Sequence, residues 1–303
     1  MPLVPSKELL QAADAAGYAV GAFNAVNMES AQAIFAAAEQ ERSPLIIQVT
    51  QTTIDYTNPD ELVALIKVLA DRATVPVALH LDHGRSFEIV MRFLRLGMTS
   101  VMIDGSLDEK GKNPRTYAEN IAVTKQVVAA AHALGVTVEA ELGRLGQIGE
   151  RISADDRDGA LTDPDQAAEF VAETGVDILA VAIGTTHGLF KGTPVIVHDR
   201  LEKINQKVSV PLVMHGGTGV PDEAATKAIK LGICKINIDT EIRVAFYNSV
   251  HDTVTKLEQG YQEADAKGDV RKYDIRKILG PARDAMKDAI ATKMRLFGSA
   301  GKA

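Results

Sequence analysis

The stretch VALHLDHG (77–84) joins an apolar, strand-like run to a histidine and a glycine. Two later stretches, ILAVAIGTTHG (178–188) and PLVMHGGTG (211–219), follow the same plan. Enzymes built from alternating strands and helices place their chemistry at the carboxyl ends of parallel strands. We therefore expect these segments to be buried parallel strands whose terminal histidines meet at one end of a sheet.

Short runs rich in valine and isoleucine alternate with alanine-rich stretches of helical periodicity along the chain. Several runs are almost continuously apolar, which is typical of strands covered on both faces. Their number and spacing match an α/β fold of the (β/α)8 TIM-barrel class. An open, doubly wound sheet is the alternative, because periodicity alone does not exclude it. The expected strands span residues 18–23, 44–49, 75–81, 99–103, 136–141, 177–183, 210–215 and 234–239.

The part of the chain beyond about residue 240 predicts a C-terminal helical extension of the barrel. Neither a linker nor an internal repeat divides the 303 residues, so we expect a single domain over residues 1–303.

The composition excludes several classes of partner. The net charge is −7 and no basic block stands out, so nucleic-acid binding is not expected, and anionic substrates need local binding groups. A single cysteine, Cys234, fits a reducing cytoplasm. The sequence has no signal-peptide pattern and no apolar run near the roughly 18 residues of a membrane span. We expect a cytoplasmic protein that binds no membrane.

The three terminal histidines point to a metal. Neutral imidazoles are preferred zinc ligands, so His83, His187 and His215 are candidate ligands of one Zn²⁺ ion. Asp82 precedes the first of them and offers a proton-transfer group. In an extended strand neighbouring side chains face opposite sides, so the turn at Gly84 must redirect Asp82 or His83.

Acids close two further strands, Asp104 in VMIDG and Glu141 in VEAELG. An unpaired buried carboxylate is costly, so each acid is expected to bind metal, to anchor a histidine ring or to join an ion pair. For Asp82 a helix N-cap is the alternative to proton transfer. His80 is interpreted as a structural, hydrogen-bonded histidine.

Glycine-rich turns follow the later strands, and their backbone N–H groups can line a phosphate. The loops after the seventh and eighth strands are a usual phosphate site of such barrels. Ordinary turns and helix caps are the alternatives. The candidate phosphate- or substrate-binding residues of this region are Gly188, Lys191, Gly216, Gly217, Thr218, Asn237, Asp239, Thr240 and Arg243.

Taken in order, these segments resemble the class II, zinc-dependent aldolases of ketose bisphosphates. The resemblance covers nearly the whole chain and keeps the motif order, which is more specific than any single motif. It implies a TIM barrel, a catalytic Zn²⁺ and a homo-oligomer, either a homodimer or a homotetramer. The matching pieces are GAFNAVNMES (21–30), HLDHG (80–84), MIDGS (102–106), EAELG (139–143), AIGTTHG (182–188), HGGTG (215–219), NIDTEIR (237–243) and KYDIRKILGPARDAM (272–286).

The resemblance also implies roles in an aldol cleavage in which zinc stabilises an enediolate. His83, His187 and His215 are the implied zinc ligands. Asp82 is the residue that exchanges a proton with the C4 oxygen. Many relatives carry adjacent acids in the long loop after the fifth strand, whereas this chain has QIGER, so Glu150 is the candidate base for the C3 proton.

Further positions follow from the same resemblance. Asp104 and Glu141 match a second divalent metal position, and a monovalent cation, Na⁺ or K⁺, is expected near the backbone of Gly188 and Gly216. Thr50 stands where relatives often have serine at the second phosphate. The dihydroxyacetone-phosphate site is implied for Gly188, Gly216, Gly217, Thr218 and the stretch Asn237, Ile238, Asp239 and Thr240, with Lys191 as a further phosphate candidate.

Substrate choice within the family rests on four residues. Asp239, Arg243, Asp274 and Arg276 resemble fructose-type members, so the expected reaction is cleavage of fructose 1,6-bisphosphate to dihydroxyacetone phosphate and glyceraldehyde 3-phosphate. The alternatives are a tagatose 1,6-bisphosphate aldolase, a zinc hydrolase and a non-catalytic sugar-phosphate-binding barrel. A zinc hydrolase would usually begin with a His-x-His pair, which this chain lacks.

Overall fold

The computed structural model describes residues 3–143, 160–186, 188, 195–261 and 274–303. Its strands form a closed parallel barrel in sequence order, with β8 paired to β1, so the expected (β/α)8 TIM barrel is confirmed and the open sheet is excluded. The strands are β1 Val20–Asn24, β2 Leu45–Thr50, β3 Val77–Gly84, β4 Ser100–Ile103, β5 Thr137–Leu142, β6 Ile178–Val181, β7 Leu212–Met214 and β8 Ile233–Ile238.

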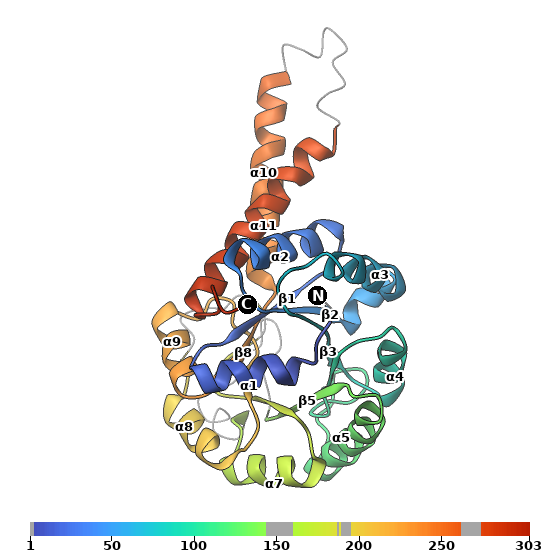
Figure 1. Cartoon of the computed structure of the whole chain (residues 1–303), viewed down its shortest axis with the longest axis vertical. Coiled ribbons are helices and arrows are strands. Elements are labelled where there is room, and N and C mark those ends of the chain that lie inside the picture. Colours follow the sequence, from blue (N-terminus) through green and yellow to red (C-terminus); the bar gives the residue numbers. More distant parts are fainter. Residues whose placement is uncertain (1–2, 144–159, 187, 189–194, 262–273) are drawn as a thin grey trace.

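Helices surround the barrel as an outer ring (Figure 1). Several begin at capping side chains: Asn27 accepts a hydrogen bond from the Ser30 amide, Thr116 accepts one from the Glu119 amide, and Asp163 caps α7. The helices are α1 Ser6–Ala16, α2 Met28–Glu41, the 3-10 helix η1 Gln51–Asp55, α3 Pro59–Ala70, α4 Phe87–Arg95, α5 Tyr117–His132, α7 Pro164–Thr174, α8 His198–Lys207, α9 Asp222–Lys230, α10 Thr240–Tyr261 and α11 Arg276–Leu296.

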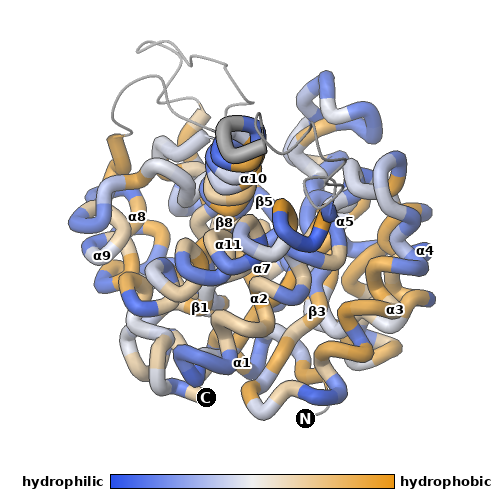
Figure 2. Tube along the Cα trace, turned by 90° about the horizontal axis from the view of Figure 1, so that it is seen from above, coloured by the Kyte–Doolittle hydropathy of each residue, from blue (hydrophilic) through white to orange (hydrophobic). Residues whose placement is uncertain are grey.

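The barrel interior is apolar at one end. Leu10 and Ala13 of α1 pack there against inward-facing residues such as Ile46, Ala78 and Val213. Figure 1 shows α1 lying across this end of the barrel, and Figure 2 shows both chain ends beside it. Because α1 covers the amino ends of the strands, a ligand reaches the interior from their carboxyl ends.

The expected C-terminal extension is also confirmed. Helices α10 and α11 pack against each other, and α11 packs against α2. Figure 1 shows the end of α10 and the start of α11 projecting together beyond the ring of helices. Across the described part of the chain, no helix is both long and apolar enough to span a membrane.

Candidate active site

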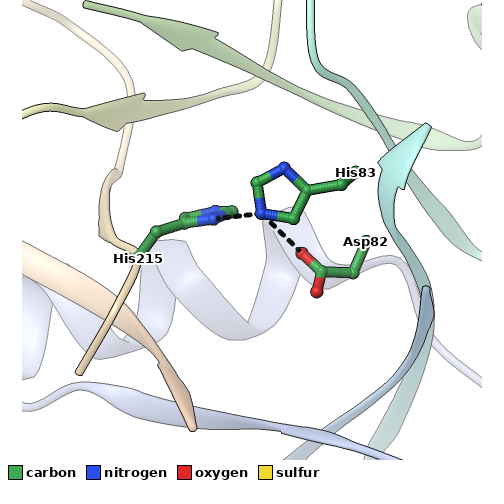
Figure 3. A group of neighbouring side chains, drawn as sticks. All are labelled: Asp82, His83 and His215. Carbon is green, nitrogen blue, oxygen red and sulfur yellow. Dashed lines mark hydrogen bonds and ion pairs between the residues drawn. The ribbon is translucent and has the colours of Figure 1, made fainter. Parts of the chain in front are cut away.

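Asp82, His83 and His215 converge at the carboxyl end of the barrel (Figure 3). The Nε2 atom of His83 lies 3.0 Å from Nδ1 of His215 and 3.8 Å from Oδ1 of Asp82. The two imidazole rings meet edge to face, with centroids 4.7 Å apart. Two strands that are remote in the sequence thus direct two ring nitrogens and a carboxylate oxygen to one point.

A local break in β3 makes this convergence possible. The pairing of β3 with β4 shifts register between Leu81 and Gly84, and His83 has a left-handed backbone with φ of 53°. Such a bulge turns the strand and re-aims its side chains. The sequence predicts a redirection at Gly84, but the left-handed residue is His83 itself, which brings its ring to the same side as Asp82.

Each ring is anchored on its other nitrogen by a carboxylate. His215 Nε2 lies 2.9 Å from Glu139 Oε1, and His83 Nδ1 lies 3.3 Å from Asp104 Oδ2. Metal-binding histidines are usually held this way, because the outer hydrogen bond fixes the tautomer and the ring orientation. The donor set therefore fits a divalent ion such as zinc between His83 Nε2 and His215 Nδ1.

A second group of potential ligands adjoins the first. Ligand atoms of His83, Asp104 and Glu141 all lie within 4.8 Å of one another. One oxygen of Glu141, Oε2, is buried and has no hydrogen-bond partner among the described residues. An orphaned buried carboxylate oxygen beside another carboxylate calls for a cation.

The carboxylates shape the electrostatics of the site. Burial alone would raise the pKa of Asp82, but the imidazoles of His83 and His215 lower it below its ordinary value. Burial alone would lower the pKa of His83, but Asp82 and Asp104 raise it to about 10. Burial raises the pKa of Glu141 well above its ordinary value, and the Asp104 charge adds to this. The site thus favours a positive charge at His83, which a proton or a metal ion can supply.

Three amides hold the Asp82 carboxylate. Asn24 and Gln48 donate to Oδ2 over 3.0 and 3.3 Å, and Asn237 donates to Oδ1 over 3.2 Å. Asn237 was predicted as a site residue from the sequence, whereas Asn24 and Gln48 were not. The signal was a single amide side chain in each of these apolar strands, at the end of β1 and within β2. These contacts exclude the helix-cap alternative for the Asp82 side chain, because both oxygens accept from barrel side chains.

A second missed feature is an ion pair inside the barrel. Lys235 Nζ lies 2.7 Å from Glu139 Oε2, and both side chains are completely buried. Lys235 also approaches His80 Nε2 at 3.4 Å, and His80 Nδ1 bonds Ser100 Oγ at 2.7 Å. Burial, reinforced by the Lys235 charge, lowers the pKa of His80 well below its ordinary value. The structural, hydrogen-bonded role predicted for His80 is confirmed.

A cavity of about 510 Å³ opens over this cluster. It brings together residues that the sequence analysis proposed from widely separated segments. The proposed residues that line it are Thr50, Asp82, His83, Asp104, Glu141, Gly188, Gly216, Thr218, Asn237, Asp239, Thr240 and Arg243.

Asp239 and Arg243 form a pair at the start of α10. Arg243 Nε lies 2.8 Å from Asp239 Oδ1, and Nη2 lies 2.7 Å from Oδ2. Burial raises the pKa of Asp239 to about 6, although Arg243 opposes this shift. The pair places a two-pronged guanidinium at the cavity wall.

Other proposed residues are placed differently. Gly217 and Ile238 do not line the cavity: the Gly217 amide donates to Asn237 O over 3.1 Å, and the Ile238 side chain belongs to the apolar core. Asp274 and Arg276 lie at the start of α11 on the projecting extension, where Arg276 donates to both carboxylate oxygens of Asp274. Three proposed residues fall outside the described ones: Glu150, His187 and Lys191.

The chain is similar over its full length to known aldolases. The family model "Fructose-bisphosphate aldolase class-II" matches residues 4–302. A fructose-bisphosphate aldolase of Thermus caldophilus is 44% identical, over 99% of this chain and 100% of that protein. A sulfofructosephosphate aldolase of Alkalicoccus urumqiensis is 41% identical, over 100% of this chain and 99% of that protein.

A solved aldolase structure is similar to this chain as well. The crystal structure of the YdjI aldolase from Escherichia coli K12 superposes with a TM-score of 0.83 at 36% identity, and the match covers 100% of both chains. Since the family model and these relatives span almost all of it, this chain belongs to the class II fructose-bisphosphate aldolase family.

Proposed function

We propose that this chain catalyses the reversible aldol cleavage of fructose 1,6-bisphosphate to dihydroxyacetone phosphate and glyceraldehyde 3-phosphate. The observation that carries the proposal is the convergence of Asp82, His83 and His215 beneath a cavity of about 510 Å³, in a member of this family. Metal ligands adjoin a proton-transfer group there, as such a cleavage requires.

Zinc is the proposed cofactor, held by His83, His215 and, from its position in AIGTTHG, His187. When bound, it supplies a Lewis acid that stabilises the negative charge developing on the ketose oxygen. Glu139 and Asp104 hold the two described rings in the orientation that this requires.

Asp82 is the proposed proton-transfer residue at the C4 oxygen. Its lowered pKa keeps it a carboxylate, which accepts the proton of the C4 hydroxyl in cleavage and returns it in condensation. Asn24, Gln48 and Asn237 fix the position of the carboxylate. Glu150 is the proposed base for the C3 proton.

The turns after β6, β7 and β8 are the proposed site for dihydroxyacetone phosphate. Gly216 has a φ of 65°, and a Cβ there would lie 2.3 Å from Thr186 O, so only glycine allows the two turns to approach this closely. Lys191 is a further candidate for this phosphate.

A monovalent cation, Na⁺ or K⁺, is proposed near the backbone of Gly188 and Gly216. A second divalent metal position is proposed at Asp104 and Glu141, where the orphaned Glu141 oxygen supports it.

A homodimer or homotetramer is proposed because Arg276 projects away from its own barrel. Its side chain is 87% exposed, and Asp274 holds the guanidinium through both oxygens. An exposed, oriented guanidinium on a projecting helix suits the second phosphate of a substrate bound by a neighbouring subunit, next to Thr50 of that subunit.

The single cysteine supports a cytoplasmic location.

Arg276→Ala is expected to lower kcat/KM for fructose 1,6-bisphosphate roughly 10- to 100-fold, the size of a lost charge-assisted hydrogen bond. Proton exchange on dihydroxyacetone phosphate alone should change much less, because that molecule lacks the second phosphate. Lys277→Ala, an exposed neighbour on α11, is the matched control for lost charge. Equal losses in both reactions would argue against a role at the second phosphate.

His215→Ala is expected to lose bound zinc and to lower cleavage on the order of 10²-fold or more, because it removes a metal ligand. Zinc per chain, measured by mass spectrometry after dialysis, is the first readout. His251→Ala, which removes an exposed histidine, is the control. The same test applies to His187→Ala. A variant that keeps both zinc and activity would remove that histidine from the ligand set.

The direct test of the function is a cleavage assay coupled to triose-phosphate detection, before chelation, after chelation and after zinc is restored. Tagatose 1,6-bisphosphate is tested alongside, because the choice of the fructose sugar rests on the resemblance of Asp239, Arg243, Asp274 and Arg276 to fructose-type members. Loss and recovery of activity with zinc would support the proposal. A zinc-loaded protein that cleaves neither sugar would instead favour a non-catalytic sugar-phosphate-binding barrel.

A further inference from the structure

One side of the cavity carries three cations to which the proposed mechanism assigns no role. Arg85, Lys110 and Lys112 all line the cavity. Arg85 directly follows β3, and the two lysines lie on the loop after β4. The strand order of the closed barrel places β3 across from β7, so these cations lie across the cavity from the turn at Gly216.

The loop that carries the lysines, residues 106–115, forms a hairpin. Leu107 and Pro114 form an antiparallel bridge, and the Arg115 amide donates to Ser106 O over 2.9 Å. The Asp108 carboxylate accepts hydrogen bonds from inside the hairpin, and these lower its pKa to about 2. The hairpin is therefore ordered by its own contacts before any ligand binds.

The tip of this hairpin packs on the Arg85 side chain. A Cβ at Gly111 would lie 2.4 Å from Arg85 Nη1, so the tip touches the guanidinium closely. Arg115 donates to both Leu107 O and Arg85 O, at 2.5 and 3.3 Å. The Arg85 amide donates to Gln51 Oε1 at 3.1 Å. Arg85 is thus held from the hairpin on one side and from η1 on the other.

The guanidinium still has unused hydrogen-bonding capacity. Its Nε atom is buried and, among the described residues, has no hydrogen-bond partner. The nearby acid, Asp104, is engaged by His83 and by Ser106 Oγ. A buried N–H without an acceptor is costly, and an anionic oxygen from a ligand would satisfy it.

We propose that Arg85, assisted by Lys110 and Lys112, binds the terminal anionic group of the aldehyde half of the substrate from within the same barrel, so that the second phosphate is held by this cluster as well as by Arg276 of a neighbouring subunit. The inference rests on the proposed function. Gly216, Asp82 and Arg85 all line the cavity, so a sugar with one phosphate at the Gly216 turn and its reacting carbons over Asp82 would direct its far end to the side that Arg85 lines. A chain of net charge −7 needs local cations for this anion, and a planar guanidinium matches a phosphate or a sulfonate.

The test compares two acceptors in the condensation direction, with zinc-loaded enzyme and dihydroxyacetone phosphate as the common donor. D-Glyceraldehyde 3-phosphate carries the terminal anion, and D-glyceraldehyde lacks it. The measured quantity is kcat/KM for D-glyceraldehyde 3-phosphate divided by kcat/KM for D-glyceraldehyde. For Arg85→Met, this ratio is expected to fall roughly 10- to 100-fold. Arg85→Lys should restore part of the ratio. Arg95→Met, an exposed arginine on α4 outside the cavity lining, should leave the ratio unchanged.

A second variant keeps the test decisive if Arg85→Met does not fold. Lys110→Met/Lys112→Met changes only exposed side chains of the hairpin, and should lower the same ratio by a smaller factor that shrinks as salt rises. A third acceptor, 3-sulfolactaldehyde, distinguishes a sulfonate from a phosphate as the preferred anion.

The outcomes separate this inference from the proposed function. A wild-type enzyme that condenses neither acceptor would overturn the function itself. An active wild type in which Arg85→Met slows both acceptors equally would overturn the inference, because Arg85 would then act through Asp104. An unchanged ratio in both the arginine and the lysine variants would overturn it as well.

Discussion

Replacing Asp82 by alanine is expected to leave zinc bound and to lower the turnover of fructose 1,6-bisphosphate by a factor on the order of 10²–10⁴. This is the usual contribution of a positioned acid–base group. The carboxylate lies 3.8 Å from His83 Nε2 and accepts hydrogen bonds from Asn24, Gln48 and Asn237. Removing it deletes the proton acceptor while both imidazoles keep their anchoring carboxylates.

Zinc content and two rates distinguish this role from a general disturbance of the Asp82 variant. Cleavage of the bisphosphate should fall, while exchange of the C3 proton of dihydroxyacetone phosphate should persist, because that step does not involve the C4 oxygen. Asp82→Asn is the matched control for shape, since its amide fills the same space without accepting a proton. Wild-type turnover in either variant would remove Asp82 from the mechanism.

Lys235→Met is expected to lower the free energy of unfolding by about 3–5 kcal/mol, the usual cost of leaving one charge of a buried pair without its partner. The partner, Glu139, is completely buried and also holds His215. We therefore expect weaker zinc binding in the same variant, because the carboxylate can move away from the histidine ring. Urea unfolding and a zinc titration measure the two effects.

The double variant Lys235→Met/Glu139→Gln is the control for Lys235→Met. It removes both charges, keeps a side-chain oxygen near His215 and should recover part of the lost stability. If the single variant proves as stable as the wild type, the Lys235–Glu139 ion pair does not stabilise the interior of the barrel.

Much of the fold was predictable because each strand of this barrel is a short apolar run between helices. The main differences lie at strand ends. β7 spans only Leu212–Met214, whereas residues 210–215 were expected, and β3 continues to Gly84 through its bulge. Hydrophobic pattern marks what is buried, but strand ends depend on the pairing partner, which one sequence does not reveal.

The candidate site was predictable where polar residues end an apolar strand, as at Asp82 and His215. It was missed at Gln48 and Glu139, which lie within their strands, and at Asn24, an uncharged amide at the end of β1. Glu139 stands two residues before Glu141, so both side chains face the interior. Only Glu141, at the end of the strand, was predicted as a site residue. The left-handed backbone of His83 was not predictable either, since its residue type permits it without requiring it.

The apolar layer between α1 and the amino ends of the barrel strands has a practical consequence for directed evolution. Leu10 and Ala13 of α1 and Ala78, which precedes His80 by one inward-facing position, lie on the amino side of the layer that contains Glu139 and Lys235. Libraries aimed at heat resistance can vary this region while the reactive end stays as it is. Libraries selected for activity on new aldehyde substrates should instead vary residues at the carboxyl ends of the strands, where the cavity lies.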